Sequence, residues 1–174
     1  MRRPADEERI RQLARRLGAL AARRVRLYLT GGATAVLEGW RKSTLDIDVR
    51  LEPEDDALLR ELPELKERLG VNIELASPTD FIPELPGWRD RSPMLFREGN
   101  LDVHHFDPYS QALSKIERGF ELDLADARAM IDRGLVEPAR LLELFAQIEA
   151  HLYRYPAIDP VAFRRRLSKL TGAL

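Results

Sequence analysis

Alternating apolar and polar positions mark two strands early in the chain, over Val25–Leu29 and Leu45–Leu51. Every second residue in each run is apolar, so each strand offers one apolar face to a core. Asp46 and Asp48 fall on the polar face of the second strand, with Cα atoms roughly 6.6 Å apart. Two carboxylates at this spacing can converge on a hard cation or a metal pair, which calls for a third acid.

A Gly-Gly turn follows the first strand and precedes a short helix predicted over Ala33–Trp40. The missing side chains of Gly31 and Gly32 allow unusual backbone angles and the close approach of a ligand. A phosphate there would be stabilised by the free N–H groups and the dipole of the helix. An ordinary strand-to-helix turn is the alternative. The next loop, residues 41–44, carries two cations and two hydroxyls that suit phosphate or a polar surface loop.

The rest of the pattern predicts more helices than strands. Strands are expected over Val71–Leu75, Met94–Arg97 and Leu101–Phe106, the last two as a hairpin. Ser77–Pro93 contains four prolines and is expected to be a rigid loop. Apolar residues at helical spacing predict helices over residues 7–24, 54–69, 108–119, 122–133, 137–153 and 160–170.

These elements predict an α+β fold with a mixed sheet of about four to five strands. The sheet core is expected over residues 25–106, with an N-terminal helix over 1–24 and a helical part over 108–174. A length of 174 residues is that of one domain. The C-terminal helices are expected to complete the core or to make a dimer contact, so the chain would act as a monomer or a homodimer.

Composition narrows the function classes. With 44% hydrophobic and 33% charged residues, the chain is neither a disordered nor a membrane protein. No apolar run approaches ~18 residues, and the charged N-terminus lacks the apolar segment of a signal peptide, so the cytoplasm is the expected location. The absence of cysteine leaves carboxylates and three histidines as metal ligands.

Charge argues against a general surface for polyanions, because the net charge is only −1. Cations nevertheless cluster in the first helix and at residues 164–169. A solvated helix face is the simpler interpretation of these clusters. A surface for tRNA or another polynucleotide acceptor remains the alternative.

Asp102 is the preferred third acid. It lies in an apolar strand, where an unpaired carboxylate would be costly unless it met a cation or hydrogen-bond donors. A solvent-facing aspartate on an edge strand is the alternative, and Glu74, on a shorter strand, is the competing third acid. His104 shares the face of Asp102 and is expected either to assist the site or to lie at the surface.

Four charged residues on two consecutive helices predict a polar network. Lys115 and Arg118 are three residues apart on the first helix, and Asp123 and Asp126 are three apart on the next. This spacing places each pair near one helix face. The residues alone are consistent with a structural ion-pair network.

Gly-Gly followed after thirteen residues by Asp-Ile-Asp on a strand resembles the signature of the nucleotidyltransferase superfold, the polymerase-beta-like group. The K-x-x-R-x4-D-x-x-D segment from Lys115 to Asp126 is similar to that of the abortive-infection nucleotidyltransferase toxins. The whole chain resembles a minimal bacterial family of this superfold, over most of residues 25–135. Many such enzymes have Ser after the first Gly, whereas Gly32 and Ala33 follow Gly31 here.

The resemblance implies transfer of a nucleoside monophosphate from an NTP to an acceptor, with two Mg²⁺ or Mn²⁺ ions. The acceptor would be RNA such as a tRNA end, a protein hydroxyl or a small molecule. The implied metal ligands are Asp46, Asp48 and Asp102, with Glu74 as runner-up, and Lys115 would neutralise the leaving pyrophosphate. The implied nucleotide contacts are Gly31, Gly32, Thr34, Arg41, Ser43, Thr44 and Arg118, and the supporting residues are Asp123, Asp126 and His104.

Two other functions are open. The chain could be a binding module that has lost turnover, or one half of a toxin and antitoxin pair, and the Gly32-Ala33 departure agrees with either. It could also be a metal-dependent phosphohydrolase that uses the same carboxylates with water as the acceptor. The three functions give different outcomes in a labelling assay: a labelled acceptor, free nucleotide, or neither.

Overall fold

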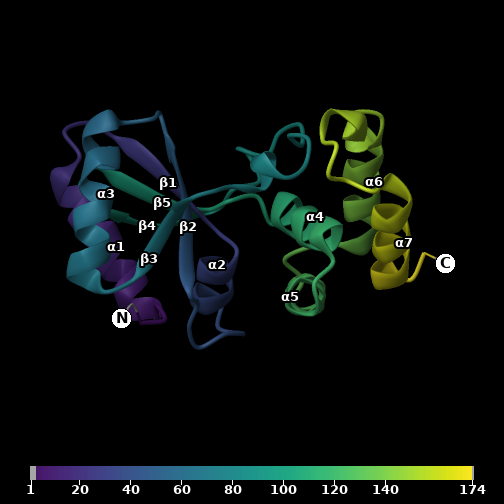
Figure 1. Cartoon of the computed structure of the whole chain (residues 1–174), viewed down its shortest axis with the longest axis horizontal. Coiled ribbons are helices and arrows are strands. Elements are labelled where there is room, and N and C mark those ends of the chain that lie inside the picture. Colours follow the sequence, from purple (N-terminus) through teal and green to yellow (C-terminus); the bar gives the residue numbers. More distant parts are fainter. Residues whose placement is uncertain (1–2, 174) are drawn as a thin grey trace. The chain divides into compact units, whose positions relative to one another are not determined.

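The computed structural model describes residues 3–173 and divides the chain into two compact units. The first unit comprises residues 1–77 and 92–106, and the second comprises residues 78–91 and 107–174. Figure 1 labels the helices and strands of both units. That the chain acts as one domain stays a prediction.

The first unit is built on a five-stranded sheet with the order β3-β2-β1-β5-β4. The strands are β1 (Val25–Thr30), β2 (Asp46–Glu52), β3 (Asn72–Leu75), β4 (Met94–Glu98) and β5 (Leu101–His105). Central β1 pairs antiparallel with β2 and parallel with β5, β3 runs parallel with β2, and β4 runs antiparallel with β5. The mixed sheet confirms the predicted α+β fold.

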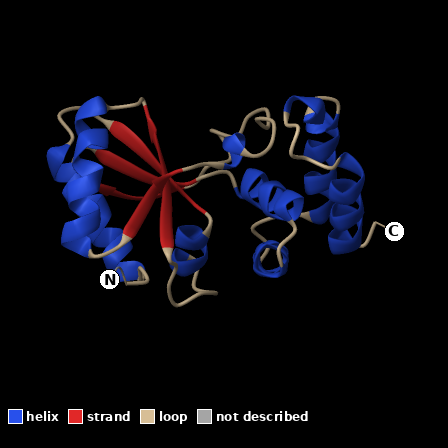
Figure 2. Cartoon of the chain, viewed as in Figure 1, coloured by secondary structure: helices blue, strands red, loops and turns tan. Residues whose placement is uncertain are grey.

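Helices α1 (Glu7–Leu20) and α3 (Asp56–Leu69) lie side by side against one face of this sheet (Figure 2). Their apolar stripes bury Leu13, Leu17 and Leu62 against the alternating apolar residues of the strands. Asp6 and Asp55 begin the two helices by accepting hydrogen bonds from first-turn N–H groups. Helix α1 ends at Leu20, four residues before the predicted end.

The opposite face of the sheet carries the polar residues of the same alternation. Arg26 of β1 lies opposite Glu52 of β2 and Asp102 of β5 in the strand register. Short helix α2 (Gly32–Leu37) follows β1 and contacts β1 and β2. It stops before the predicted end because Gly39 has a φ of +85°, which a helix cannot continue through.

The second unit is helical. It contains η1 (Pro78–Asp80), α4 (Pro108–Arg118), α5 (Glu121–Asp132), α6 (Pro138–Glu149), η2 (Leu152–Arg154) and α7 (Pro160–Thr171). Its core buries Trp88, Leu113, Met130 and Phe163. Prolines at the first turns of α4, α6 and α7, and left-handed glycines that end α4 and α7, match the start and stop signals of the sequence. Among residues 3–173, no helix has the length and apolar character to cross a bilayer.

Candidate functional site

The Gly-Gly turn lies directly against the second carboxylate of the Asp-x-Asp motif. Gly31 has a φ of +62°, and a Cβ added to it would lie 3.0 Å from Oδ2 of Asp48. A Cβ added to Gly32 would lie 1.9 Å from Oγ1 of Thr44. A side chain at position 31 would be strained by the backbone angle, and one at position 32 would overlap the Thr44 side chain. The two glycines therefore keep the main chain of the turn in close contact with the end of β2.

Asp46 and Asp48 stand beside a polar pair on the neighbouring strand. Parallel pairing of β2 with β3 sets Asp46 opposite Asn72 and Asp48 opposite Glu74. The Asn72 amide nitrogen donates to Oδ1 of Asp46 at 2.7 Å and to Oε1 of Glu74 at 2.8 Å. The structure thus brings together both acids of the motif and the runner-up third acid.

Asn72 is the member of this group that sequence reasoning missed. The signal was present, because Asn72 and Glu74 share one face in the alternation of residues 71–75. Its side-chain amide links the acids of two strands, and this link could only be recognised once β3 was known to pair with β2.

Asp102 lies elsewhere on the sheet. Asp48 is the register partner of Thr30, whereas Asp102 is the partner of Arg26, and four residues along a strand correspond to about 13 Å. The structure therefore does not bring Asp102 to the Asp-x-Asp motif. Its carboxylate accepts from Nε of Arg24 at 2.8 Å and from Nε of Arg97 at 2.5 Å, which supplies the compensation that a buried carboxylate needs.

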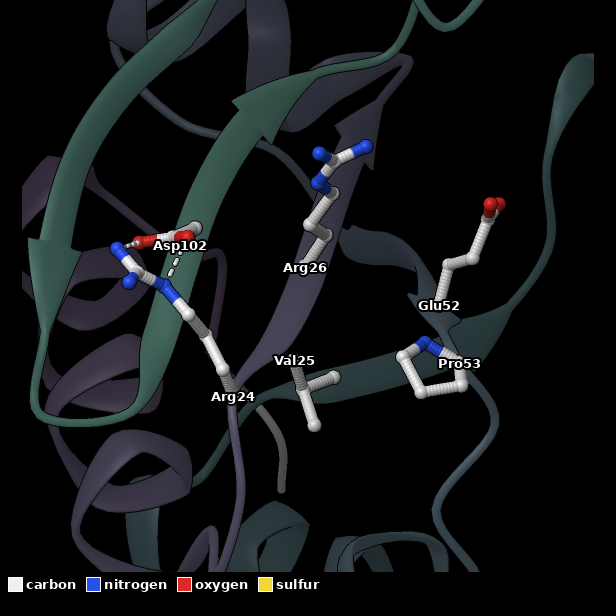
Figure 3. A pocket seen from close by; sticks show the side chains of 6 residues that line it. All are labelled: Arg24, Val25, Arg26, Glu52, Pro53 and Asp102. Atoms are coloured by element: carbon white, nitrogen blue, oxygen red, sulfur yellow. Dashed lines mark hydrogen bonds and ion pairs between the residues drawn. The ribbon is translucent and has the colours of Figure 1, made fainter.

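Figure 3 shows the pocket beside this carboxylate, with Arg24 turned toward Asp102. The pocket has a volume of about 550 Å³, and Arg26, Glu52 and Pro53 also line it. The salt bridges make Asp102 the anionic partner of two arginines.

A divalent cation suits the donors near the motif by their chemistry. Carboxylate oxygens are the ligands that Mg²⁺ prefers, and Asp46, Asp48 and Glu74 supply them on adjacent strands. In the described chain, however, no three His, Asp or Glu side chains are placed to hold a metal ion. The Asn72 amide instead bridges Asp46 and Glu74, and it occupies one oxygen of each carboxylate.

The loop before β2 is tied to the N-terminal segment. Thr44 is buried, and its N–H and C=O groups exchange backbone hydrogen bonds with Ala5. Its hydroxyl donates to the carbonyl of Asp46 at 3.0 Å, a local backbone contact of the kind expected for such a loop. Arg41 is half-buried and Ser43 is exposed. Thr44 therefore supports the main chain of the motif.

Thr34 and His105 form a buried polar link between α2 and β5. The Thr34 hydroxyl lies 3.1 Å from Nδ1 of His105, and the His105 Nε2 atom lies 2.9 Å from Oε1 of Glu38. Burial lowers the pKa of His105, although the Glu38 carboxylate opposes this shift. The neutral ring then donates from Nε2 to Glu38 and accepts the Thr34 hydroxyl at Nδ1. Sequence reasoning did not find this link, which joins residues far apart in the chain.

His104 points to the opposite side of β5 from His105. Its ring centroid lies 5.4 Å from that of Tyr28, and its Nδ1 atom lies 3.0 Å from the carbonyl oxygen of Ser92. In the register His104 pairs with Tyr28, between the positions of Asp48 and Asp102. An aromatic contact and a backbone contact therefore hold this ring.

The four predicted charges of the second unit form one network. Lys115 is buried, with Nζ 2.7 Å from Oδ2 of Asp126 and 3.6 Å from Oδ1 of Asp123. The other oxygen of Asp123 lies 3.4 Å from Nε of Arg118. Both aspartates are buried as well, so the cations compensate carboxylates that would otherwise be costly.

Comparison with known proteins identifies a family for the chain. Residues 8–156 match the model of a family described as "Nucleotidyltransferase of unknown function (DUF6036)". No curated protein and no solved structure gives a match to the chain. The family model covers the Gly-Gly turn, the Asp-x-Asp motif and the Lys115 network. The chain belongs to this nucleotidyltransferase family.

Proposed function

We propose that this protein transfers a nucleoside monophosphate from an NTP to an acceptor hydroxyl. The observation that carries the proposal is the contact of Gly31 with Asp48, where an added Cβ would lie 3.0 Å from Oδ2. A phosphate seated on the turn would lie beside the carboxylates of β2. In the reaction the acceptor oxygen bonds to the α-phosphorus while the bond from that phosphorus to the pyrophosphate oxygen breaks.

Asp46, Asp48 and Glu74 are proposed to hold Mg²⁺ or Mn²⁺ ions. Glu74 takes the place first expected for Asp102, because Glu74 is the register partner of Asp48 and Asp102 is occupied by two arginines. Bound there, the ions would lower the pKa of the acceptor hydroxyl and neutralise phosphate charge. Asn72 would orient the carboxylates of Asp46 and Glu74 before the ions bind.

The chain itself supplies phosphate seats and cations. The main-chain N–H groups at Gly31 and Gly32 are proposed to hold the phosphates in place of the usual Ser hydroxyl. Lys115, whose ammonium group lies 2.7 Å from Oδ2 of Asp126 within the second unit, is proposed as a further phosphate-binding cation. Arg41 and Ser43 are proposed as further phosphate contacts in the loop before β2.

A labelling assay tests the proposal. The protein is incubated with each of the four α-³²P-labelled NTPs in the presence of Mg²⁺ or Mn²⁺. Total RNA, lysate protein and lysate small molecules are supplied as acceptors in separate reactions. We expect label on one acceptor class with native protein, and none with Asp48→Asn or Glu74→Gln. Asp102→Asn is the matched control, since it changes a strand aspartate on the same face, and it should retain labelling. Circular dichroism checks that each variant folds.

The outcomes separate the candidate functions. Absence of label with all four nucleotides and both metals would rule out the transferase. Release of nucleoside monophosphate without any labelled acceptor would indicate a phosphohydrolase. Neither labelling nor release would leave the binding module or the toxin and antitoxin partner. Loss of labelling in Asp102→Asn but not in Glu74→Gln would restore Asp102 as the third acid.

A further inference from the structure

Two exposed phenylalanines of the second unit lie beside one guanidinium. The centre of the Arg118 guanidinium is 5.9 Å from the ring centroid of Phe81 and 5.6 Å from that of Phe120. Phe81 is 42% exposed and Phe120 is 64% exposed, whereas the other four phenylalanines are buried or half-buried. Leu122 nearby in the sequence is 61% exposed. We call Phe81, Arg118 and Phe120 the aromatic and cationic patch. Phe81 directly follows η1, and the other two residues lie where α4 ends and α5 begins.

Phe120 is largely exposed and does not cap its helix. It occupies the N-cap position of α5, where its side chain makes no capping hydrogen bond. Ser, Thr, Asp or Asn at such a position typically adds about 1 kcal/mol to helix stability. A ring that is 64% exposed also leaves much of its apolar surface in water. Neither capping nor packing explains a phenylalanine here, which favours a role in contact with a ligand.

Arg118 is held in place by the network already described. Its Nε lies 3.4 Å from Oδ2 of Asp123, and the other oxygen of that carboxylate lies 3.6 Å from Nζ of Lys115. The patch is therefore continuous with Lys115, through a single buried carboxylate. A ligand with an anionic group at Lys115 and a planar ring at the two phenylalanines would therefore contact both sides of Asp123.

We propose that Phe81, Arg118 and Phe120 form a stacking platform for a nucleobase. Aromatic rings and guanidinium planes stack on the faces of unpaired bases, and a cation beside a ring strengthens such contacts. Because every base has a π-face, the platform tolerates all four bases. The base comes either from the NTP or from a single-stranded RNA acceptor. Its place in the reaction rests on the proposed function, whereas base binding itself requires no turnover.

Direct binding to the full chain tests the platform. ATP, GTP, CTP, UTP and inorganic triphosphate are titrated by calorimetry, and a fluorescent single-stranded RNA of mixed sequence by anisotropy. We expect Phe120→Leu, and likewise Phe81→Leu, to weaken binding of the base-containing probe by roughly fivefold to tenfold, because leucine keeps apolar bulk but loses the π-face. Inorganic triphosphate should bind all proteins equally. Tyr153→Leu is the control, because Tyr153 is also an exposed aromatic residue beside an arginine. Its ring is 74% exposed, and its centroid lies 5.7 Å from the centre of the Arg154 guanidinium.

Each result decides the proposal. Weaker NTP binding assigns the platform to the donor base, and weaker binding of RNA alone assigns it to the acceptor. Unchanged affinity of both probes in both variants overturns it, as does wild-type protein that binds neither probe. Retention of a lysate protein that depends on Phe120, without nucleotide or RNA binding, also overturns it in favour of a protein contact. The titrations measure base binding and the labelling assay measures turnover. Weaker binding of a base-containing probe by Phe120→Leu, without labelling by the wild type, would therefore support the platform and rule out the transferase.

Discussion

Replacing Gly32 by alanine sets two opposing effects against each other. Gly32 is the first residue of α2 and has no positive φ, so alanine would favour the helix by about 1 kcal/mol at most. Its Cβ, however, would lie 1.9 Å from Oγ1 and 2.6 Å from Cβ of Thr44. Rotation of the Thr44 side chain moves Oγ1 but leaves Cβ in place. A loss of stability in Gly32→Ala would therefore show that the overlap with Thr44 outweighs the gain in helix propensity.

Thr44 has little freedom to withdraw. Its backbone donates to Ala5 at 2.9 Å and accepts from Ala5 at 2.7 Å, and its hydroxyl donates to the carbonyl of Asp46 at 3.0 Å. Overpacking in such a site costs about 1–3 kcal/mol, and loss of the hydroxyl contact adds about 1 kcal/mol. Gly32→Ala should therefore lower the free energy of unfolding by about 1–3 kcal/mol after the helix gain is subtracted.

Urea unfolding followed by circular dichroism measures this change. Thr44→Gly removes both overlapping atoms, so Gly32→Ala should cost much less in a Thr44→Gly background. The double-mutant cycle should give a favourable coupling of about 1–3 kcal/mol. A Gly32→Ala protein as stable as the wild type, or additive effects in the cycle, would refute the close contact.

Three further changes test other parts of the structure. The lowered pKa of His105 means that the unfolded chain binds more protons than the folded chain just below pH 6.5. The free energy of unfolding should therefore decrease as the pH is lowered through this range, by up to about 1.4 kcal/mol per pH unit. His105→Gln should flatten this slope in urea titrations from pH 5 to 8. Gly31→Ala should reduce labelling more than Gly39→Ala does, because both have positive φ but only Gly31 contacts Asp48; equal activities would contradict this. Arg166 donates to two carbonyls in the last turn of α4, so Arg166→Met should lower the unfolding free energy by about 1–3 kcal/mol, measured by urea unfolding.

Secondary structure was predictable because local signals agree with each other. The two-residue period found β1 and β2 within about one residue, and Pro108 with Gly119 bounded α4 as expected. The end of α1 was predicted too late, at residue 24. Leu20 and Ala21 continue the apolar spacing, but the chain turns at Ala21, whose backbone is extended.

Contacts between segments far apart in the chain could not be predicted from local sequence patterns. The link from Thr34 to His105 spans 71 residues, and the pair of Arg24 with Asp102 spans 78. Charge and spacing in the sequence cannot choose among many such partners. The network of Lys115 was predictable in outline because its members are at most 11 residues apart, on two consecutive helices.

The choice of third acid shows which step needs the structure. Alternation places Asp102 and Glu74 on polar strand faces, and both are acids on strands that follow the motif. Strand order favours Glu74, because β3 pairs directly with β2 whereas β5 lies on the far side of β1. Charge points the same way: a cation at Asp102 would have to displace two guanidiniums, while one at Glu74 would replace a single neutral amide. Because displacing a paired cation costs more than displacing an amide, Glu74 is the acid that we place beside Asp46 and Asp48.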